Sequence, residues 1–310
     1  MLTRPHRMTE LAESLSQCIA QGLRGKQEAI EFALIALFAG GHLLIEDHPG
    51  VGKTLLARSI AKALDLPFQR VQCTADLLPA DIVGAQVYQP RTGELSFRQG
   101  PVFTSVLLAD ELNRTPPRTQ SALLECMAER RVTIDRETYA LPDPFFVIAT
   151  QNPMTSAGTY PLPENQLDRF LLRIQLGYPD LEHEIEVVEY EDGHRIVDAI
   201  RPVATAAELT AARKRVEAVR CDRELTAFIV ELAHRTRASA ETVLGVSTRG
   251  AQALHRACRA RAFVHGRDFV VPDDVRALLV PAWAHRLTTL RGEDAEAMLH
   301  ETLAGTPLPD

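Results

Sequence analysis

A short glycine-rich loop, set between an apolar run and a helical pattern, limits the folds open to this chain more than any other segment. The apolar run His42–Glu46 comes first, and a loop with the sequence DHPGVGKT follows it. The next residues, Leu55–Leu64, have the spacing of an amphipathic helix. This order predicts a buried strand, a tight turn and a helix that begins directly after the turn.

The residue types in this loop are suited to holding phosphate groups. Glycine lets the backbone curl until successive N–H groups point at phosphate oxygens. Lys53 adds positive charge for the β- and γ-phosphates, Thr54 offers a hydroxyl to Mg²⁺, and the helix start adds its positive end. We therefore predict a nucleotide-binding loop made of His48, Pro49, Gly50, Val51, Gly52, Lys53, Thr54 and Leu55, with Thr54 as a metal ligand.

One position departs from the strict G-x-x-x-x-G-K-[ST] pattern, which has glycine where this chain has Asp47. Aspartate tolerates a left-handed backbone better than most residues do, so we expect the loop to keep its shape. The alternative interpretation is an ordinary turn between a strand and a helix. The strand before the loop, the helix after it and the Pro49-Gly50 pair inside it favour nucleotide binding.

A second apolar run, Val106–Asp110, ends in two acids, Asp110 and Glu111. In a nucleotide-binding fold the first acid meets Mg²⁺ and the second polarises the attacking water as a general base. Solvated charges at a strand end are the alternative, which the phosphate loop upstream disfavours. The chain has no Asn-Lys-x-Asp guanine motif, so we expect ATP rather than GTP. A kinase would need an acceptor site and would not usually have a glutamate here.

Three further polar residues are candidates for the chemistry. Asn152 follows the apolar run Phe145–Thr150 and is placed to hold the attacking water or touch the γ-phosphate, with a plain Asn-Pro turn as the alternative. Arg169 precedes another apolar run, and Arg249 opens a helical pattern from which it could reach back across an interdomain cleft to the nucleotide. Arginine neutralises phosphate charge in a transition state, including in trans. Spacing alone singles out neither arginine.

The chain as a whole predicts an α/β domain followed by a helical one. Five short apolar runs suit a parallel sheet with helices on both faces, at 42–46, 68–73, 106–110, 145–150 and 171–176. Helical patterns lie at 28–38, 55–64 and 118–129. The segments 87–97 and 131–141 have the pattern of hairpins, and 182–192 is an acidic helical run. From Thr205 onward we predict no strand and four helices, at 205–218, 222–238, 247–264 and 272–287.

Composition and charge exclude several classes of protein. The net charge is −7, from 34 basic and 41 acidic residues, without the basic footprint of a duplex-binding protein, so we expect no nucleic-acid partner. The five cysteines are an odd number with no CxxC pair, which favours free thiols in a reducing compartment. No apolar run approaches the ~20 residues of a membrane span, and the first residues lack a signal peptide's apolar core. We expect a cytoplasmic protein.

Together these segments resemble one family, the MoxR-type AAA+ ATPases. The resemblance covers about residues 20–285 and is most specific in the long segment LLADELNRTPPRTQSALLE at 107–125. Further matches lie at 41–54, 145–153, 166–170 and 266–275. The resemblance implies an AAA+ P-loop core over 1–190, with a five-stranded parallel sheet between helices and two hairpin insertions, and a C-terminal helical lid over 191–310.

The resemblance also implies how the nucleotide is held. The glycine-rich loop resembles Walker A, and aspartate at position 47 is usual in this family. Asp110 and Glu111 resemble Walker B, with Asp110 as the second metal ligand and Glu111 as the catalytic base. Gly25 lies where such proteins approach the adenine ring. ATP and Mg²⁺ are the implied ligands.

The remaining candidates resemble the catalytic sensors of the family. Asn152 resembles sensor 1, Arg169 the arginine finger that completes a neighbour's site, and Arg249 sensor 2. The segment 247–249 reads Ser-Thr-Arg where the family more often has Ser-Pro-Arg, a change that should affect the helix start more than the reach of the arginine. Arg114 is similar to a family arginine after the Walker B acids, and the sequence does not assign its role.

For the whole protein the resemblance implies rings, usually hexamers, with ATP sites at subunit interfaces. It also implies chaperone-like action on client protein complexes, often together with a partner that carries a von Willebrand A domain. The predicted function is therefore an ATP-hydrolysing motor that remodels or matures its clients. A magnesium-chelatase-like ATPase subunit and a nucleotide-gated scaffold with little turnover are the alternatives.

Overall fold

The computed structural model describes residues 6–91, 93–152, 158–189, 193–290 and 294–307, and its centre is a five-stranded parallel sheet. The strand order is β2-β5-β8-β1-β9, and every neighbouring pair is parallel. Each predicted apolar run forms one of these strands, so the predicted sheet is confirmed. The strands are β1 (Leu43–Glu46), β2 (Phe68–Gln72), β5 (Val106–Asp110), β8 (Phe146–Gln151) and β9 (Leu172–Ile174).

Alternate residues of the strands face two apolar cores, one on each side of the sheet. Leu43 and Ile45 of β1 belong to the first core, and Leu44 between them belongs to the second. Burial on both faces explains why the strands are continuous apolar runs in the sequence. Helices α1 (His6–Gly22), α2 (Gln27–Phe38) and α3 (Lys53–Ala63) pack in the first core, and α4 (Pro79–Val83) and α5 (Pro117–Glu129) in the second. The sequence did not predict α1.

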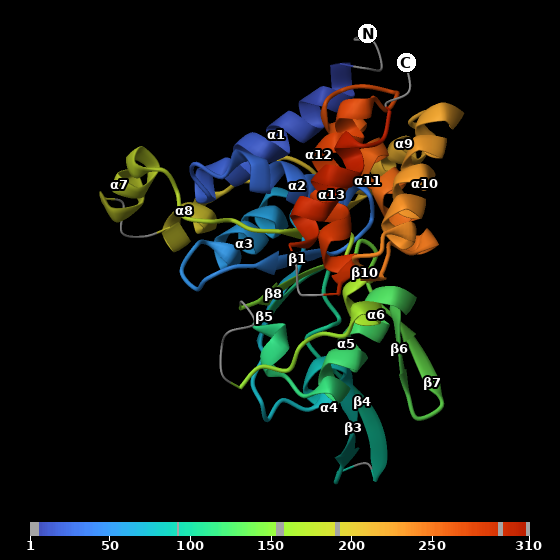
Figure 1. The fold of residues 1–310 in the computed structure, drawn as a ribbon. Coiled ribbons are helices and arrows are strands. Elements are labelled where there is room, and N and C mark those ends of the chain that lie inside the picture. Colours follow the sequence, from blue (N-terminus) through green and yellow to red (C-terminus); the bar gives the residue numbers. More distant parts are fainter. Residues whose placement is uncertain (1–5, 92, 153–157, 190–192, 291–293, 308–310) are drawn as a thin grey trace.

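Two hairpins project from the sheet, below it in the view of Figure 1. The first pairs β3 (Gly84–Gln89) with β4 (Glu94–Gln99), and the second pairs β6 (Arg131–Ile134) with β7 (Glu137–Ala140). Both predicted hairpins are therefore present. The first begins three residues earlier than predicted, because Gly84 and Ala85 join the ladder through backbone hydrogen bonds and have no side-chain pattern to mark them.

Four short helices lie in the connections, the first two between elements of the sheet domain and the last two between β9 and the C-terminal part. They are η1 (Leu112–Arg114), α6 (Glu164–Leu167), α7 (Leu181–Glu189) and α8 (Gly193–Ala199). The predicted acidic helix at 182–192 corresponds to α7, which stands away from the rest of the chain at the left of Figure 1. Residues 190–192 lie outside the described part of the chain. The predicted boundary between core and lid, at 190/191, therefore stays a prediction.

The C-terminal part is a helical lid. The four helices predicted from Thr205 onward are confirmed as α9 (Ala206–Ala218), α10 (Arg223–Ala238), α11 (Thr248–Val264) and α12 (Pro272–Trp283). The last ends earlier than predicted and continues as η2 (Ala284–Arg286). The expectation of no strand is wrong: β10 (Thr242–Leu244) pairs with β11 (Thr288–Thr289), a pairing too short for a sequence pattern to show. A further helix, α13 (Ala295–Ala304), was not predicted.

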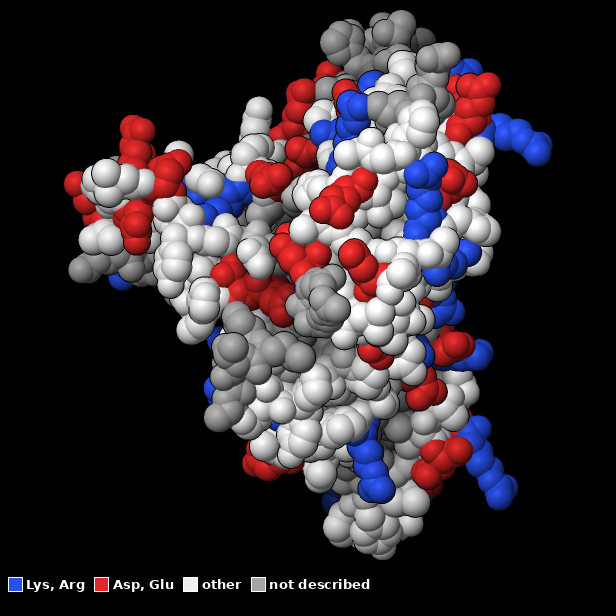
Figure 2. Space-filling view, in the orientation of Figure 1, with Lys and Arg blue, Asp and Glu red and all other residues white. Residues whose placement is uncertain are grey.

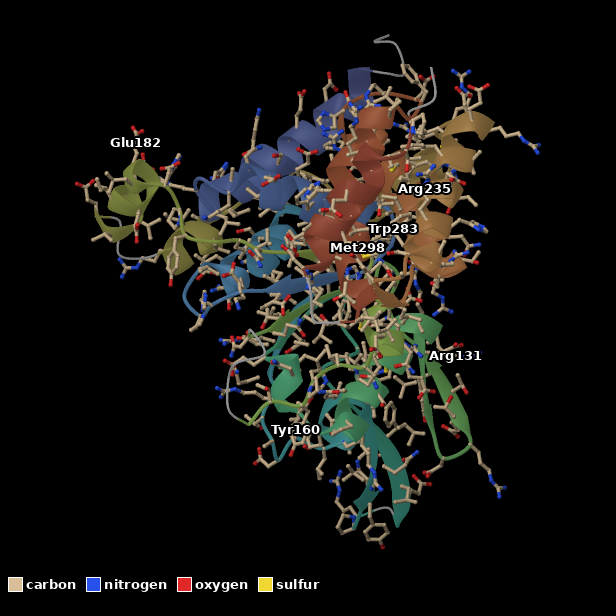
Figure 3. The ribbon with its side chains drawn as sticks, in the orientation of Figure 1. Arg131, Tyr160, Glu182, Arg235, Trp283 and Met298 are labelled. Carbon is tan, nitrogen blue, oxygen red and sulfur yellow. The ribbon has the colours of Figure 1, made fainter. Side chains whose placement is uncertain are left out.

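The lid shares the first apolar core with α1 and α2. Helix α11 contacts both of them, and Phe263 of α11 lies edge-on to Phe38 of α2 with ring centroids 5.1 Å apart. Trp283 is fully buried within the lid, and its Nε1–H donates to the carbonyl oxygen of Gly250 at 2.8 Å (Figure 3). All five cysteines are free, as predicted. Among the described residues no helix is long and apolar enough to cross a membrane.

Candidate nucleotide site

The glycine-rich loop lies between the carboxyl end of β1 and the first residue of α3. Gly50 and Gly52 have φ values of +88° and +98°, in the left-handed region that favours glycine. A Cβ atom at Gly52 would also lie 2.7 Å from Cδ1 of Leu23. Helix α3 begins at Lys53, so its free N–H groups and positive end lie at the loop. This backbone is the one that phosphate binding requires.

Asp47, the departure from the strict motif, fastens the loop to the segment after β9. Its Oδ2 accepts hydrogen bonds from the N–H groups of Leu176 and Gly177 at 2.7 and 2.6 Å, and its Oδ1 accepts from the N–H of His48 at 2.8 Å. The aspartate is tolerated for this reason and not through a left-handed backbone, since Asp47 is not among the residues with positive φ. A glycine here would lose all three bonds.

Lys53 is nearly buried and points back into the loop. Its Nζ donates to the carbonyl oxygen of Asp47. Burial lowers the pKa of Lys53, and the charges of Asp47, Asp110 and Glu111 oppose that shift. An anionic phosphate in the loop would supply the same compensation, so the lysine is placed to pair with it.

The two acids at the carboxyl end of β5, Asp110 and Glu111, are held by one hydroxyl group. Thr150 of β8 donates its hydroxyl to Oδ1 of Asp110 at 2.7 Å, and its Oγ1 accepts the backbone N–H of Glu111 at 2.8 Å. Glu111 has φ = +59°, a conformation uncommon for a residue with a side chain. This backbone turn directs the two carboxylates differently, as their separate predicted roles require.

Asn152 lies beside Glu111. Its Nδ2 donates to Oε1 of Glu111 at 2.8 Å. Its backbone is fixed by Asn113, whose Nδ2 donates to the Asn152 carbonyl at 3.0 Å and whose Oδ1 accepts the Asn152 N–H at 3.4 Å. The sequence did not single out Asn113, because nothing local shows that η1 returns to the end of β8.

Sequence reasoning also missed two residues of β2. Arg70 pairs with Oδ2 of Asp110 at 2.6 Å, and Gln72 donates to Oε2 of Glu111 at 3.2 Å. Gln72 is in register with Asp110 across the β2–β5 pair. Strand order, which places β2 next to β5, was the missing information. Arg114, whose role the sequence left open, lies with its Nε 3.4 Å from Oε2 of Glu111.

Most of the predicted binding residues line one cavity of about 410 Å³. The predicted residues that line it are Pro49, Gly50, Gly52, Lys53, Thr54, Leu55, Asp110, Glu111 and Asn152. His48 is exposed and Val51 buried, and neither lines the cavity. Gly25 does not line it either and packs against His183 of α7, whose Cγ would be 2.8 Å from a Cβ at position 25. We call this cavity, with its loop and acids, the phosphate cavity.

The two predicted catalytic arginines lie together in a different place. They line a cavity of about 450 Å³ that contains five arginines and a single acid, Asp168, and that we call the arginine cavity. Asp168 accepts from Nε of buried Arg286 at 2.7 Å and lies 3.8 Å from Nε of Arg249. Arg169 donates to the carbonyl of Leu124 at 2.9 Å. The five arginines are Arg130, Arg169, Arg249, Arg256 and Arg286.

These two cavities share no lining residue. They lie at opposite ends of the strands, the phosphate cavity at the carboxyl ends and the arginine cavity at the amino ends. The phosphate cavity follows the carboxyl end of β1, whereas Gly41 and His42, just before β1, line the arginine cavity. Arg249 therefore does not reach back to the phosphate loop of its own chain, as the sequence suggested it could. The structure brings Arg169 and Arg249 together with each other, and both away from Glu111.

The oxygen ligands expected for Mg²⁺ are present. The Thr54 hydroxyl and the Asp110 carboxylate line the same cavity, and oxygen ligands of this kind are the ones Mg²⁺ prefers beside phosphates. The described residues contain no group of three or more His, Cys, Asp or Glu side chains that could hold a metal without a nucleotide. The donor set thus fits a metal that binds together with phosphate.

A parallel sheet of this order, a glycine-rich loop before α3 and a helical lid define a P-loop nucleotide-binding protein of the AAA+ class. Residues 42–172 match the ATPase family associated with various cellular activities (AAA), and residues 234–302 match the AAA lid domain. A crystal structure of a "putative ATPase" from Cytophaga hutchinsonii superposes with a TM-score of 0.91 at 34% identity, covering 99% of this chain and 97% of that one.

Proteins of similar sequence identify the family within the AAA+ class to which the chain belongs. The "Uncharacterized protein YeaC" of Bacillus subtilis is 43% identical over 92% of this chain and 91% of its own length. "Chaperone MoxR1" of Mycobacterium tuberculosis is 38% identical over 85% of this chain and 72% of its own length, and the "Protein MoxR" of Methylorubrum extorquens is 32% identical over 87% and 85%. The chain belongs to the MoxR-type AAA+ ATPases.

Proposed function

We propose that the protein is an ATP-hydrolysing, chaperone-like motor that works as a ring, with ATP bound between subunits. The separation of the two cavities carries this proposal. Glu111 and the phosphate loop lie at the carboxyl ends of the strands, and Arg169 and Arg249 lie at the amino ends. A single chain therefore leaves its phosphate cavity without either of the predicted catalytic arginines, Arg169 and Arg249. A second copy of the chain, turned so that its arginine cavity faces that loop, supplies both of these arginines.

Within one subunit the residues divide the work on ATP. The N–H groups of the loop and Lys53 bind the β- and γ-phosphates, and the start of α3 adds its dipole. Thr54 and Asp110 would hold Mg²⁺, which neutralises phosphate charge when bound. Glu111 accepts the proton of the attacking water. Arg169 and Arg249 of the next subunit stabilise the charge of the transition state.

The contacts of Glu111 suggest how this carboxylate is kept inactive before ATP binds. Asn152 occupies Oε1, while Gln72 and Arg114 occupy Oε2. A carboxylate with both oxygens engaged is poorly placed to take a proton from water. We infer that nucleotide binding draws Asn152 or Arg114 away and frees the glutamate. The γ-phosphate, an acceptor for both side chains, is the group able to do so.

The client-binding part of the proposal rests on the β3–β4 hairpin. Val87, Tyr88 and Leu95 lie on it and expose 42%, 59% and 66% of their surface. Apolar side chains gathered on a projecting hairpin are typical of a contact surface for another protein. The name of the similar "Chaperone MoxR1" agrees with a client-remodelling role. Any partner with a von Willebrand A domain stays a prediction.

The test is the ATPase rate per subunit measured against protein concentration, with mass photometry on the same samples. Shared sites predict that the rate rises as oligomers form and that Arg169→Ala abolishes it. Arg276→Ala, an exposed arginine on α12 outside both cavities, is the matched control and should leave the rate unchanged. A rate that is independent of assembly contradicts shared sites, and negligible turnover with ATP bound supports the nucleotide-gated scaffold instead.

A further inference from the structure

Helix α7 has an apolar face that nothing in the described part of the chain covers. None of its residues is buried, and it stands away from the body of the molecule (Figure 1). Leu181, Ile185 and Val188 follow the i, i+4, i+7 spacing of one helix face and expose 76%, 49% and 71% of their surface. A stripe of this kind on a projecting helix indicates an interaction surface.

The same helix is strongly acidic. It carries four glutamates and no lysine or arginine, and Figure 2 shows acidic side chains gathered over it. Glu186 pairs with Arg24 at 2.7 Å. Glu182 points away from the molecule (Figure 3), and neither Glu182 nor Glu189 has an ion pair with any other described residue. The surface that covers α7 should therefore be cationic.

A cationic groove of about 430 Å³ lies on the other side of the molecule, between the end of α2 and the helices α9 and α11. Five basic residues line it, against two acids, Asp143 and Glu217. Arg213 is largely buried there, where its Nη1 lies 3.5 Å from Oδ1 of Asp143 and its Nε donates to the Leu37 carbonyl at 3.0 Å, while its Nη2 has no hydrogen-bond partner among the described residues. Burial lowers the pKa of Arg213 to about 10, so it is still charged at neutral pH. The basic residues are Arg130, Arg213, Lys214, Arg256 and Arg259.

The groove and α7 each adjoin one half of the proposed shared site. The groove has Gly40, Arg130 and Arg256 in common with the arginine cavity. Helix α7 lies near the phosphate loop, since His183 and Glu186 of α7 contact Gly25 and Arg24, and the preceding residue, Leu23, lies against Gly52 of the loop. In the proposed ring we therefore expect the groove of one subunit to lie on the side where the neighbour's α7 projects, since the groove adjoins the arginines and α7 lies near the phosphate loop.

We propose that α7 of each subunit docks on the cationic groove of the next copy of this chain, with its glutamates meeting the groove's basic residues. This inference rests on the proposed ring and adds a second contact to it, outside the nucleotide site. Docking would cover the apolar stripe and place the glutamates of α7 beside exposed basic residues of the groove, such as Lys214. It would also couple the nucleotide loop to the lid of the adjacent subunit, because α9 and α11 line the groove.

The test measures the protein concentration at half-assembly by sedimentation velocity with ATP and Mg²⁺. Glu182→Lys/Glu189→Lys should raise this concentration about tenfold, and Leu181→Ser/Val188→Ser by a similar factor. The matched control is Glu241→Lys/Glu301→Lys, which makes the same charge change on exposed lid residues outside the groove and should shift it less than twofold. Binding of a fluorescent ATP analogue to the dilute protein should be unaltered in all of them.

The partner surface is tested by charge exchange. Lys214→Glu alone should weaken assembly about threefold, and combining it with Glu182→Lys/Glu189→Lys should restore at least threefold of the loss. If wild-type protein assembles and the α7 variants assemble at the same concentration, docking through α7 is wrong while the ring stands. If assembly weakens without any recovery on exchange, the groove is not the partner. If wild-type protein does not assemble with ATP, the ring and this inference fail together.

Discussion

Asn152 donates a hydrogen bond from Nδ2 to Oε1 of Glu111 at 2.8 Å, which ties the end of β8 to the carboxylate that follows β5. These strands are neighbours in the sheet, so the contact follows directly from the strand order. The pair joins the predicted sensor to the predicted base. Under the proposed function, this contact would pass a change at the γ-phosphate to the group that activates water.

Replacing Asn152 with alanine should lower kcat for ATP hydrolysis about 10- to 100-fold, because the γ-phosphate and the attacking water lose the amide that Asn152 would offer them once ATP binds. The backbone at the end of β8 should keep its position, since Asn113 binds the backbone of residue 152 and not its side chain. ATP affinity should change less than threefold, as measured with a fluorescent analogue. An unchanged kcat would show that the Asn152 side chain has no role in turnover.

Replacing Glu111 with glutamine should abolish turnover, by at least a hundredfold, while ATP binding and assembly persist. Glutamine keeps the size of the side chain and can still bind Asn152, but it cannot take a proton from water. Single-turnover kinetics measure the loss of hydrolysis, and mass photometry on the same samples measures whether assembly persists. Residual hydrolysis near the wild-type rate would assign the base to another residue.

His42 should make folding stability fall on mild acidification. It is buried, accepts the Val147 N–H at Nδ1 (3.0 Å) and donates Nε2–H to the Met127 carbonyl (3.1 Å). Burial lowers its pKa to about 3, far below the ~6.5 of the unfolded chain. The unfolded state therefore takes up the proton first, and stability is lost as pH falls below about 6.5, by ~1.4 kcal/mol per pH unit.

His42→Gln removes this titration. Between pH 6.5 and 5 the free energy of unfolding should fall by about 2 kcal/mol less in the variant than in the wild type. Urea unfolding at a series of pH values measures the difference, and buried His285 contributes equally to both proteins. Parallel curves for the two proteins would mean that His42 already titrates normally in the folded state.

Asp274 at the start of α12 should be a main source of lid stability. It is fully buried and accepts hydrogen bonds from Arg261, Arg267 and the Val271 N–H. Burial acts to raise its pKa, but the bonds from Arg267, Val271 and Arg261 outweigh burial and leave the pKa below its usual value. The stabilisation is therefore present above about pH 4, the unfolded value, and is lost as the pH falls below it.

Asp274→Asn should lower the free energy of unfolding at pH 7 by about 3 kcal/mol, because two arginines lose the charge that compensates them. Asp273→Asn is the natural control: this neighbour is 76% exposed, and its substitution should cost less than about 0.5 kcal/mol. Chemical denaturation of both variants makes the comparison. Equal stabilities would mean that the buried cluster contributes nothing measurable.

The sheet and the phosphate loop could be predicted because their signals are local. Apolar runs such as Val106–Asp110 mark buried strands wherever they occur, and the polar residues that end them fall at one edge of a parallel sheet. The loop from Pro49 to Thr54 needed only its own sequence and its neighbours. The position of Asn152 beside Glu111 followed from the same logic once the strands were adjacent.

What could not be predicted depends on which elements are neighbours in space. Arg70 and Gln72 enter the site because β2 pairs with β5, and Asn113 does so because η1 returns to β8. No sequence pattern states either pairing. The position of Arg249 next to Arg169 depends on how the lid packs on the sheet, which the sequence of α11 alone does not determine.

The most direct test of shared ATP sites is to mix two inactive variants. Glu111→Gln subunits keep Arg169, and Arg169→Ala subunits keep Glu111. If the arginine acts on a neighbour's ATP, mixed rings contain complete interfaces, and an equimolar mixture should recover about a quarter of the wild-type rate, since one interface in four combines both intact residues. Mixed oligomers, confirmed by mass photometry with differently sized tags, that show no recovery would contradict catalysis across the subunit interface.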